Sequence, residues 1–208
     1  MQVVSVPVTE RASTGKRAAQ DFRNQGLIPA VLYGGDSVEH FGVKLNDVKS
    51  LIYTPDFKIA EIQNGSEKVK CIIKDLQIHP VTDDLMHIDF LRLVDNHPVK
   101  VEVPVRFKGT SPGVKEGGKL VQMMRRVKIK TTPEHLVDEL FVDISELKLG
   151  NSVRVRDIEA NDNLEIMTGG ATPVANVEVP RALKSQQAAE DKEGGVVVAE
   201  VAEGAPQE

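Results

Sequence analysis

Cysteine and aromatic residues are scarce in this chain of 208 residues. It has a single cysteine and no tryptophan, and aromatic residues make up 4% of the total. One cysteine cannot form an internal disulfide, and the apolar run around Cys71 favours a small buried side chain. The shortage of aromatic residues excludes the stacking platforms with which many proteins bind single-stranded nucleic acid.

Long apolar runs and an excess of positive charge are also lacking. No apolar run approaches 18 residues, and the first three residues do not open a basic-then-apolar signal sequence. We therefore expect a soluble, cytoplasmic protein without a membrane partner. The net charge is −5, and residues 183–208 hold two basic against six acidic residues. Any binding to RNA must then rest on shape and specific contacts rather than on a general attraction for phosphate.

The first 94 residues have the pattern of a compact domain with several strands and two short helices. One helix is predicted after Ser13 or Thr14, either of which can cap it, and Gly26 can end it. Asn46 can cap the second. Short apolar or alternating runs predict strands at 4–8, 30–33, 68–77 and 85–93.

The next part, residues 95–182, predicts a pure β domain, either sandwich-like or a rolled sheet. Valines at every second position from Val99 to Val105 alternate with polar or charged residues, except at Pro104. The alternation returns in shorter runs, which predict strands at 120–130, 140–144, 152–156 and 174–179. The fold class is therefore dominated by β structure. Residues 183–208 cannot bury enough apolar surface to offset their ordering entropy, and we expect a disordered acidic tail.

A histidine and an aspartate stand two residues apart in the run 85–93. Side chains alternate across a strand, so His87 and Asp89 share one face. Three interpretations are open: a structural polar pair, a metal site that includes His79, or a contact with an RNA base edge or ribose hydroxyl. No fourth ligand lies nearby in sequence, which weighs against a metal.

The segment 113–120 resembles a phosphate-binding loop, in which Gly113 is followed by four intervening residues and then by the Gly118-Lys119 pair. Its last position is Leu120, which has no hydroxyl for Mg²⁺, and an alternating strand follows instead of a helix. We therefore favour an ordinary connection between strands. The five histidines and Cys71 show no arrangement typical of nucleophilic catalysis.

Four basic residues are gathered near the start of the chain. The first helix would carry Lys16, Arg17 and Arg23 on the face opposite Phe22, and Arg11 would lie in the loop before it. This pattern fits a solvated helix face as well as an RNA contact. Tyr33 stands at a strand end before Gly34-Gly35. There its phenol could reach phosphate or ribose, and the two glycines would let an RNA backbone approach closely.

Taken together, these stretches resemble a family of bacterial ribosomal proteins, the twenty-fifth of the large subunit, which bind 5S rRNA. The ordered motifs that carry the resemblance are Gly15-Lys16, Phe22-Arg23, Gly26, 29–35, 77–80 and 87–90. Residues 104–118 and 117–120 resemble the extra domain of the long form, known as CTC or general stress protein. The resemblance covers about residues 1–180.

The resemblance implies an N-terminal β-barrel with short helices, a β-rich C-terminal domain, and docking on 5S rRNA in the central protuberance of the large subunit. It implies neither catalysis nor a cofactor. The C-terminal domain could contact neighbouring rRNA or ribosomal proteins. RNA contacts are implied at Arg11, Lys16, Arg23, Tyr33, Gln77, His87 and Asp89, and charge and position add Arg17.

One position departs from the family pattern. Many members have two consecutive arginines where this chain has Gln20-Asp21, so we expect an RNA contact surface shifted toward Lys16, Arg17 and Arg23. Two rival functions remain: a stress or interaction protein whose β domain binds another protein, and a metal-dependent hydrolase built on His79, His87 and Asp89.

Overall fold

The computed structural model describes residues 1–11, 13–35, 37–64, 67–159 and 163–180. It divides into two compact units. The first comprises Met1–Arg106, Arg126–Leu140 and Glu159–Gly169, and the second comprises Phe107–Arg125, Phe141–Ile158 and the described residues from Gly170 onward. The predicted tail at 183–208 lies outside the described residues. The domain boundary expected after residue 94 stays a prediction; the last strand of the N-terminal sheet ends at Arg92.

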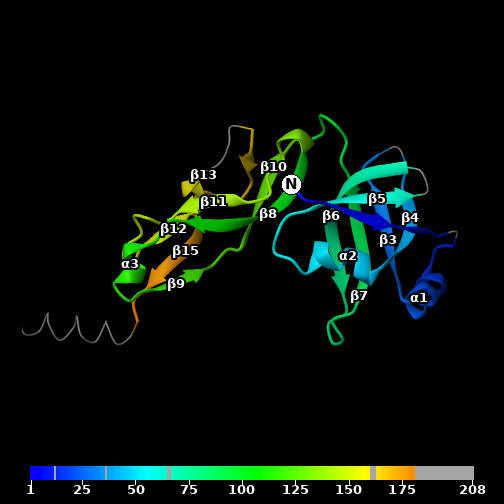
Figure 1. Cartoon of the computed structure of the whole chain (residues 1–208), viewed down its shortest axis with the longest axis horizontal. Helices are drawn as coiled ribbons and strands as arrows, with labels where there is room; N and C mark the ends of the chain where they lie inside the picture. The colour runs from blue at the N-terminus through cyan, green and yellow to red at the C-terminus, as the bar shows by residue number, and fades with distance from the viewer. Residues whose placement is uncertain (12, 36, 65–66, 160–162, 181–208) are drawn as a thin grey trace, which may run out of the picture. The chain divides into compact units, whose positions relative to one another are not determined.

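A seven-stranded sheet forms the main part of the first unit (Figure 1). Its strand order is β1-β5-β6-β7-β3-β4-β2. The two outermost strands of this order, β1 and β2, follow one another directly in the chain. β1 pairs with β5, and β2 pairs with β4. The sheet therefore curls back on itself, and the prediction of a barrel-like, β-dominated fold is confirmed. The strands are β1 (Val3–Pro7), β2 (Thr9–Glu10), β3 (Leu27–Tyr33), β4 (Glu39–Lys44), β5 (Ile59–Asn64), β6 (Glu67–Ile78) and β7 (Leu85–Arg92).

Alternate residues of these strands fill the core inside the curled sheet. Ile88 and Phe90 of β7 are fully buried, and the Phe90 ring lies 5.9 Å from that of Phe41 on β4. Cys71 of β6 is buried among them, as its sequence context predicts. Burial raises the pKa of this thiol to about 12, so Cys71 stays protonated and unreactive at neutral pH.

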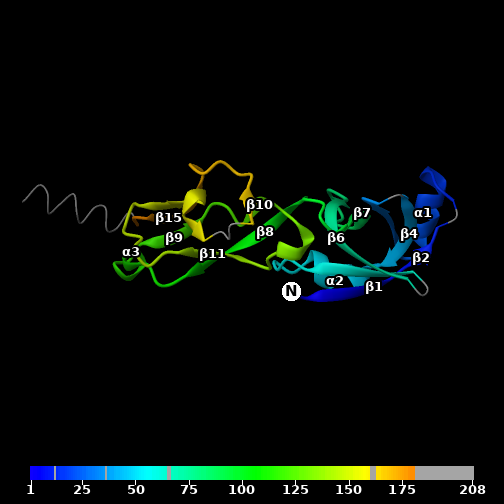
Figure 2. The ribbon, with the colours of Figure 1, turned by 90° about the horizontal axis from the view of Figure 1, so that it is seen from above.

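The first helix, α1 (Lys16–Asn24), lies at the edge of the sheet near β4 (Figure 2), and its Phe22 side chain packs against that strand. Gly42 of β4 leaves room for the ring, since a Cβ at that position would lie 2.7 Å from Phe22 Cε1. The prediction of a Ser13 or Thr14 cap was wrong: the N-cap residue is Gly15, whose φ of 110° suits glycine, and no side chain caps the helix. Gly26, with φ of 75°, follows its end as predicted.

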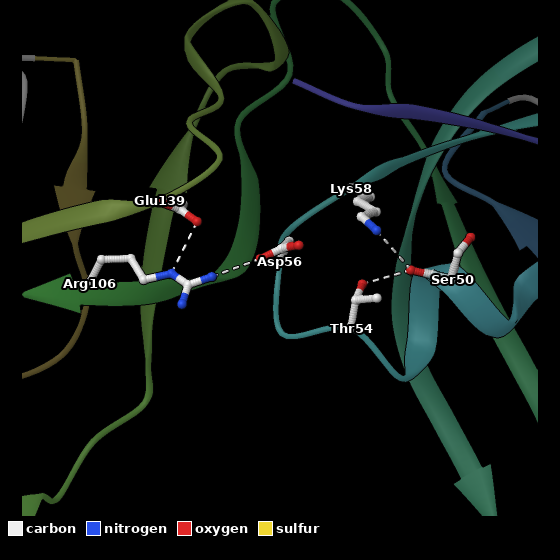
Figure 3. Close-up of polar contacts among 6 residues, drawn as sticks. All are labelled: Ser50, Thr54, Asp56, Lys58, Arg106 and Glu139. Atoms are coloured by element: carbon white, nitrogen blue, oxygen red, sulfur yellow. Dashed lines mark hydrogen bonds and ion pairs between the residues drawn. The ribbon is translucent and has the colours of Figure 1, made fainter.

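The second helix, α2 (Leu45–Ile52), starts one residue before the predicted cap Asn46 and is closed at its C-terminal end by two donors (Figure 3). Thr54 Oγ1 and Lys58 Nζ both donate to the carbonyl oxygen of Ser50, at 2.7 and 3.2 Å. These contacts satisfy a backbone acceptor that has no partner within the helix. Asp56, which lies between Thr54 and Lys58 in the sequence, accepts a hydrogen bond from Arg106 at 2.9 Å.

Two of the next three strands follow the alternation seen in the sequence, and the third, at residues 165–166, was not expected from it. β8 (Val99–Lys108) pairs antiparallel with β10 (Arg126–Thr131), which pairs with β14 (Glu165–Ile166). Arg106 of β8 donates from Nη2 to Asp56 and from Nε to Glu139, at 2.9 and 3.1 Å (Figure 3). A short 3₁₀ turn, Pro133–His135, follows β10.

The second unit contains a three-stranded antiparallel sheet with the order β12-β15-β9. The expected continuous strand at 120–130 was wrong: the chain leaves β9 after Gln122 and starts β10 at Arg126, so the two segments pair with different strands. The elements of this part of the chain are α3 (Pro112–Lys115), β9 (Lys119–Gln122), β11 (Leu140–Asp143), β12 (Ser152–Arg154), a 3₁₀ turn (Val155–Asp157), β13 (Ile158–Glu159) and β15 (Pro173–Glu178).

Candidate RNA interface

Four polar side chains form a block on the outer face of the curled sheet, opposite the core. On β6 these are Asp75 and Gln77, and on β7 they are His87 and Asp89. Asp75 is the register partner of Asp89, and Gln77 is that of His87. Register partners in an antiparallel pair point to the same face with Cβ atoms about 4.5–5.5 Å apart. We call these four residues the outer polar block.

His87 and Asp89 are joined by a hydrogen bond of 2.7 Å between Nδ1 and Oδ1. An ionised carboxylate can only accept, so Nδ1 carries the proton in this pair. That leaves Nε2 of a neutral imidazole as an acceptor for an outside group, or as a donor if the ring is protonated. Both side chains are about one quarter exposed, at 25% and 27%, so they remain accessible to a ligand.

Arg23 of α1 reaches the edge of the outer polar block. Its Nε and Nη2 atoms donate to the carbonyl oxygen of Met86, at 3.2 and 3.1 Å. The register of β6 and β7 shifts here, since Gln77 pairs with His87 and Ile78 with Leu85. Met86 is left without a ladder partner, and its carbonyl is satisfied by the guanidinium instead. Of the two alternatives left open for these basic residues, the solvated helix face therefore does not hold for Arg23, whose guanidinium contacts the sheet.

Tyr33 lies at the end of β3, the strand on the other side of β7. Val31 of β3 is the register partner of Asp89, and Tyr33 that of Leu91. The pKa of the Tyr33 phenol is raised, first by desolvation and then by the negative charges of Asp89 and Asp75. A raised pKa keeps the phenol protonated, so Tyr33 can donate a hydrogen bond at neutral and mildly alkaline pH.

The remaining basic residues of the predicted site lie at the start of α1. The Arg11 guanidinium lies 5.5 Å from the centre of the Phe22 ring and donates to the carbonyl oxygen of Gly15 at 3.3 Å. Lys16 and Arg17 are exposed, and neither side chain has a recorded partner among the described residues. This arrangement gives one anchored and two free cationic groups.

The glycine pair after Tyr33 is exposed, and close approach of an RNA backbone to it stays a prediction, but on their Cβ side both glycines face the side chains of β7. A Cβ on Gly35 would lie 2.9 Å from Arg92 Nη1, and one on Gly34 would lie 2.7 Å from Leu91 Cδ1. Arg92 is held there by an ion pair with Glu39 of β4, at 2.6 Å. The glycines therefore make room for the side chains of β7.

The metal interpretation is not supported by the geometry. His79 Nδ1 accepts hydrogen bonds from the backbone N–H of Thr82 and, at 3.4 Å, of Val81, so it stabilises the turn between β6 and β7. In the described ranges, no group of three or more His, Cys, Asp or Glu side chains is arranged to hold a metal ion.

The segment that resembles a phosphate-binding loop has a packing role. A Cβ on Gly118 would lie 2.4 Å from Val177 Cγ1, and one on Gly113 would lie 2.6 Å from the Leu149 nitrogen. The segment continues into strand β9, as the alternation predicts, and α3 has only four residues. The glycines therefore allow close contact within the second unit.

Sequence comparison identifies the class to which this architecture belongs. Residues 6–90 match the Ribosomal L25p family, and residues 98–181 match the C-terminal domain of ribosomal protein TL5. The chain is 40% identical over 192 residues to the large ribosomal subunit protein bL25 of Cytophaga hutchinsonii, covering 92% of this chain and 100% of that protein. These matches define a structural protein of the large ribosomal subunit.

Two further relatives agree with this class. The bL25 proteins of Porphyromonas gingivalis and Bacteroides fragilis are 39% and 37% identical over 186 and 185 residues. They cover 88% and 89% of this chain, and the matches span 96% and 94% of their own lengths. The chain belongs to the bL25 family, in the form with a TL5-type C-terminal domain. The relatives are ribosomal proteins and not enzymes, and within the described residues no helix is long and apolar enough to cross a membrane.

The structure brings five predicted site residues together: Arg23, Tyr33, Gln77, His87 and Asp89. Sequence reasoning missed Asp75 and the Met86 carbonyl. Both depend on the two shifts in the register of β6 and β7, and a strand's residue pattern alone does not show which residue of a partner strand lies opposite.

Proposed function

We propose that this protein binds 5S rRNA through the outer polar block and the basic residues of α1, as a non-catalytic component of the central protuberance. It acts in the cytoplasm, bound to the ribosome. The observation that carries the proposal is the hydrogen-bonded His87–Asp89 pair, held on a rigid strand and still accessible, beside the Arg23 guanidinium.

The chemistry of RNA supports this arrangement. An A-form helix hides its major groove and presents a wide minor groove with 2′-hydroxyls and base edges. A sheet face that offers an imidazole nitrogen, a carboxylate and an amide can exchange hydrogen bonds with those groups. An internal loop with non-standard base pairs changes the width of the groove, so a rigid face can select it by shape.

The cationic groups have a different role, which is to fix the position of the phosphate backbone. Lys16 and Arg17 are exposed and unpaired among the described residues, so each can neutralise a phosphate. Arg11 is stacked on Phe22, which orders its guanidinium before binding. Asp21 is exposed on the same helix, and we infer that phosphate contacts avoid its side and concentrate on Lys16, Arg17 and Arg23.

The TL5-type domain contributes a second, weaker contact in this proposal. Lys128 and Lys130 are engaged in ion pairs with Glu102 and Glu165, whereas Arg125 and Arg126 are exposed without a recorded partner. Together with other exposed cations of this domain, such as Lys119 and Lys148, these two arginines are candidates for a contact with neighbouring rRNA or ribosomal protein.

Footprinting of the full-length protein on purified 5S rRNA tests the proposal. We expect protection confined to one internal loop and its flanking duplex, and loss of that protection with His87→Ala. Protein that protects no segment, or that stays at the top of a high-salt gradient while large subunits sediment, would support the rival function of a free interaction protein.

A further inference from the structure

We propose that Asp75 is a specificity-determining residue of the RNA interface: its carboxylate, opposite Asp89, repels phosphate and accepts a hydrogen bond from a hydroxyl or amino group of the RNA. This inference rests on the proposed function. Its starting point is the register, which places the two carboxylates directly across from each other on the outer face of β6 and β7.

A shift in the strand register creates this pairing. Before the shift, Ile73 is the partner of Phe90; after it, Asp75 is the partner of Asp89, and Lys74 is the extra residue. An unbroken ladder would have placed Lys74 opposite Asp89, where opposite charges stabilise a strand pair. Lys74 instead donates to the carbonyl oxygen of Lys100, at 3.0 Å.

Packing in the core accounts for the extra residue in β6, but it does not account for an aspartate at position 75. The shift turns Leu76 toward the core, where it packs in the main hydrophobic cluster, and turns Gln77 outward beside His87. Any polar residue at position 75 would be compatible with that arrangement. A carboxylate there is the unfavourable choice, because like charges directly opposite each other destabilise a strand pair.

The Asp75 carboxylate is also held in place. Its Oδ1 atom accepts a hydrogen bond from the backbone N–H of Leu76, at 2.9 Å, and the side chain is exposed. The second oxygen remains available to an outside donor. Asp75, Asp89 and the donating phenol of Tyr33 therefore surround one small area of the sheet, consistent with the effect of both carboxylates on the Tyr33 pKa.

This area is suited to reading sugar and base edges. Phosphate oxygens only accept hydrogen bonds and carry negative charge, so two adjacent carboxylates disfavour them. A 2′-hydroxyl can donate its one hydrogen bond to either carboxylate, and an exocyclic amino group, which has two N–H bonds, can donate to both. Discrimination of this kind weakens the binding of incorrect RNA more than it strengthens the binding of the correct one.

The test compares full-length wild type, Asp75→Asn and the matched control Glu67→Gln. Asparagine keeps the shape of the side chain and an oxygen that can accept from Leu76, but removes the charge. Glu67 is exposed on the same strand, and its replacement removes the same charge about 25 Å away, at 3.2–3.4 Å per residue. That distance exceeds the Debye length of about 8 Å at physiological salt.

The measured quantity is the ratio of the affinity for 5S rRNA to the affinity for an unrelated RNA duplex. We expect Asp75→Asn to reduce this ratio by about 5- to 100-fold, the range of one good base contact, mainly through tighter binding of the unrelated duplex. Glu67→Gln should leave it unchanged. We also expect Asp75→Asn, but not Glu67→Gln, to raise the urea midpoint of unfolding, because the like-charge contact is removed.

An unchanged ratio in both Asp75→Asn and Asp75→Ala, with wild type still selective for 5S rRNA, would overturn the inference and leave the proposed function intact. If wild type itself shows no preference for 5S rRNA, the proposed function fails first. If Asp75→Asn and Glu67→Gln lower the affinity ratio by the same factor, the effect comes from net charge. That result would also contradict a local role for Asp75.

Discussion

Two polar strand faces in the first unit differ in how their charges are paired. On β8, β10 and β14 the register places Lys128 opposite Glu102, and Lys130 between Glu165 on one side and Lys100 on the other. Both Lys128 and Lys130 form ion pairs with these glutamates, at 3.5 and 3.0 Å. On β6 and β7 the register places Asp75 opposite Asp89.

The two faces therefore differ in whether register partners of opposite charge are present. On the β8–β10 face Lys128 and Lys130 each have an ion-pair partner, whereas Lys130 also lies opposite Lys100 and Arg126 has no recorded partner in the described part of the chain. The outer polar block leaves an imidazole nitrogen, an amide and one oxygen of the Asp75 carboxylate without a recorded partner among the described residues, and the like charges of Asp75 and Asp89 lower its stability. Substitutions on these two faces and in the core beneath them should therefore have different effects on the free energy of unfolding and on RNA binding.

The largest expected effect comes from the inner side of β7. Phe90→Ala removes a fully buried ring and should lower the free energy of unfolding by about 3–5 kcal/mol, measured by urea denaturation. His87→Ala, on the outer side of the same strand, should lower it by less than about 1 kcal/mol. A large loss of stability with His87→Ala would assign that histidine a structural role.

The next largest effect concerns RNA binding by the outer polar block. His87→Ala should weaken binding to 5S rRNA by about 1–3 kcal/mol, since both its hydrogen bond to Asp89 and its free nitrogen are lost. Filter binding or fluorescence anisotropy measures this loss. His97→Ala, a change to an exposed loop histidine, serves as the control and should bind like wild type.

A smaller effect is expected from the exposed cations of α1. Lys16→Ala should reduce the slope of log affinity against log salt by about 0.9, the value for one lost phosphate contact in a duplex. Lys49→Ala on α2 removes the same charge outside the candidate interface and should leave the slope as it is. An unaltered slope for Lys16→Ala would remove this residue from the interface.

The smallest effect is expected on the charge-complementary face. A double-mutant cycle with Lys128→Ala and Glu102→Ala should give an interaction free energy below about 1 kcal/mol, because both side chains are at least half exposed. Binding of 5S rRNA should not change. A loss of RNA binding with Lys128→Ala would show that this face also belongs to the interface.

The sequence predicted residues well where one periodic pattern controls the structure. The alternation of valines located β8, and the two-residue spacing placed His87 and Asp89 on one face. Gly26 after α1 was also found, because a positive φ strongly favours glycine. In each case the signal lies within a few neighbouring residues.

Features that depend on pairing between distant segments could not be predicted. The break between β9 and β10 depends on which strand each half pairs with, and the alternation from Leu120 to Lys130 gives no sign of it. The contact of Arg23 with Met86 joins residues 63 positions apart through a bulge. Arg92 beside Gly35 likewise comes from a strand far along the chain.

The closure of the barrel by the N-terminal segment has a consequence for the order of events during synthesis. Val3 pairs with Ile59, and Glu10 with Phe41, while β3 has to wait for β7 to emerge before Tyr33 and Asp89 become neighbours. Pairings over such separations are slow, because loop-closure entropy must be overcome first. β3 therefore acquires its last neighbour only after the first two strands can have found theirs, and a nascent chain shorter than about ninety residues would lack the pairing of β3 and β6 with β7.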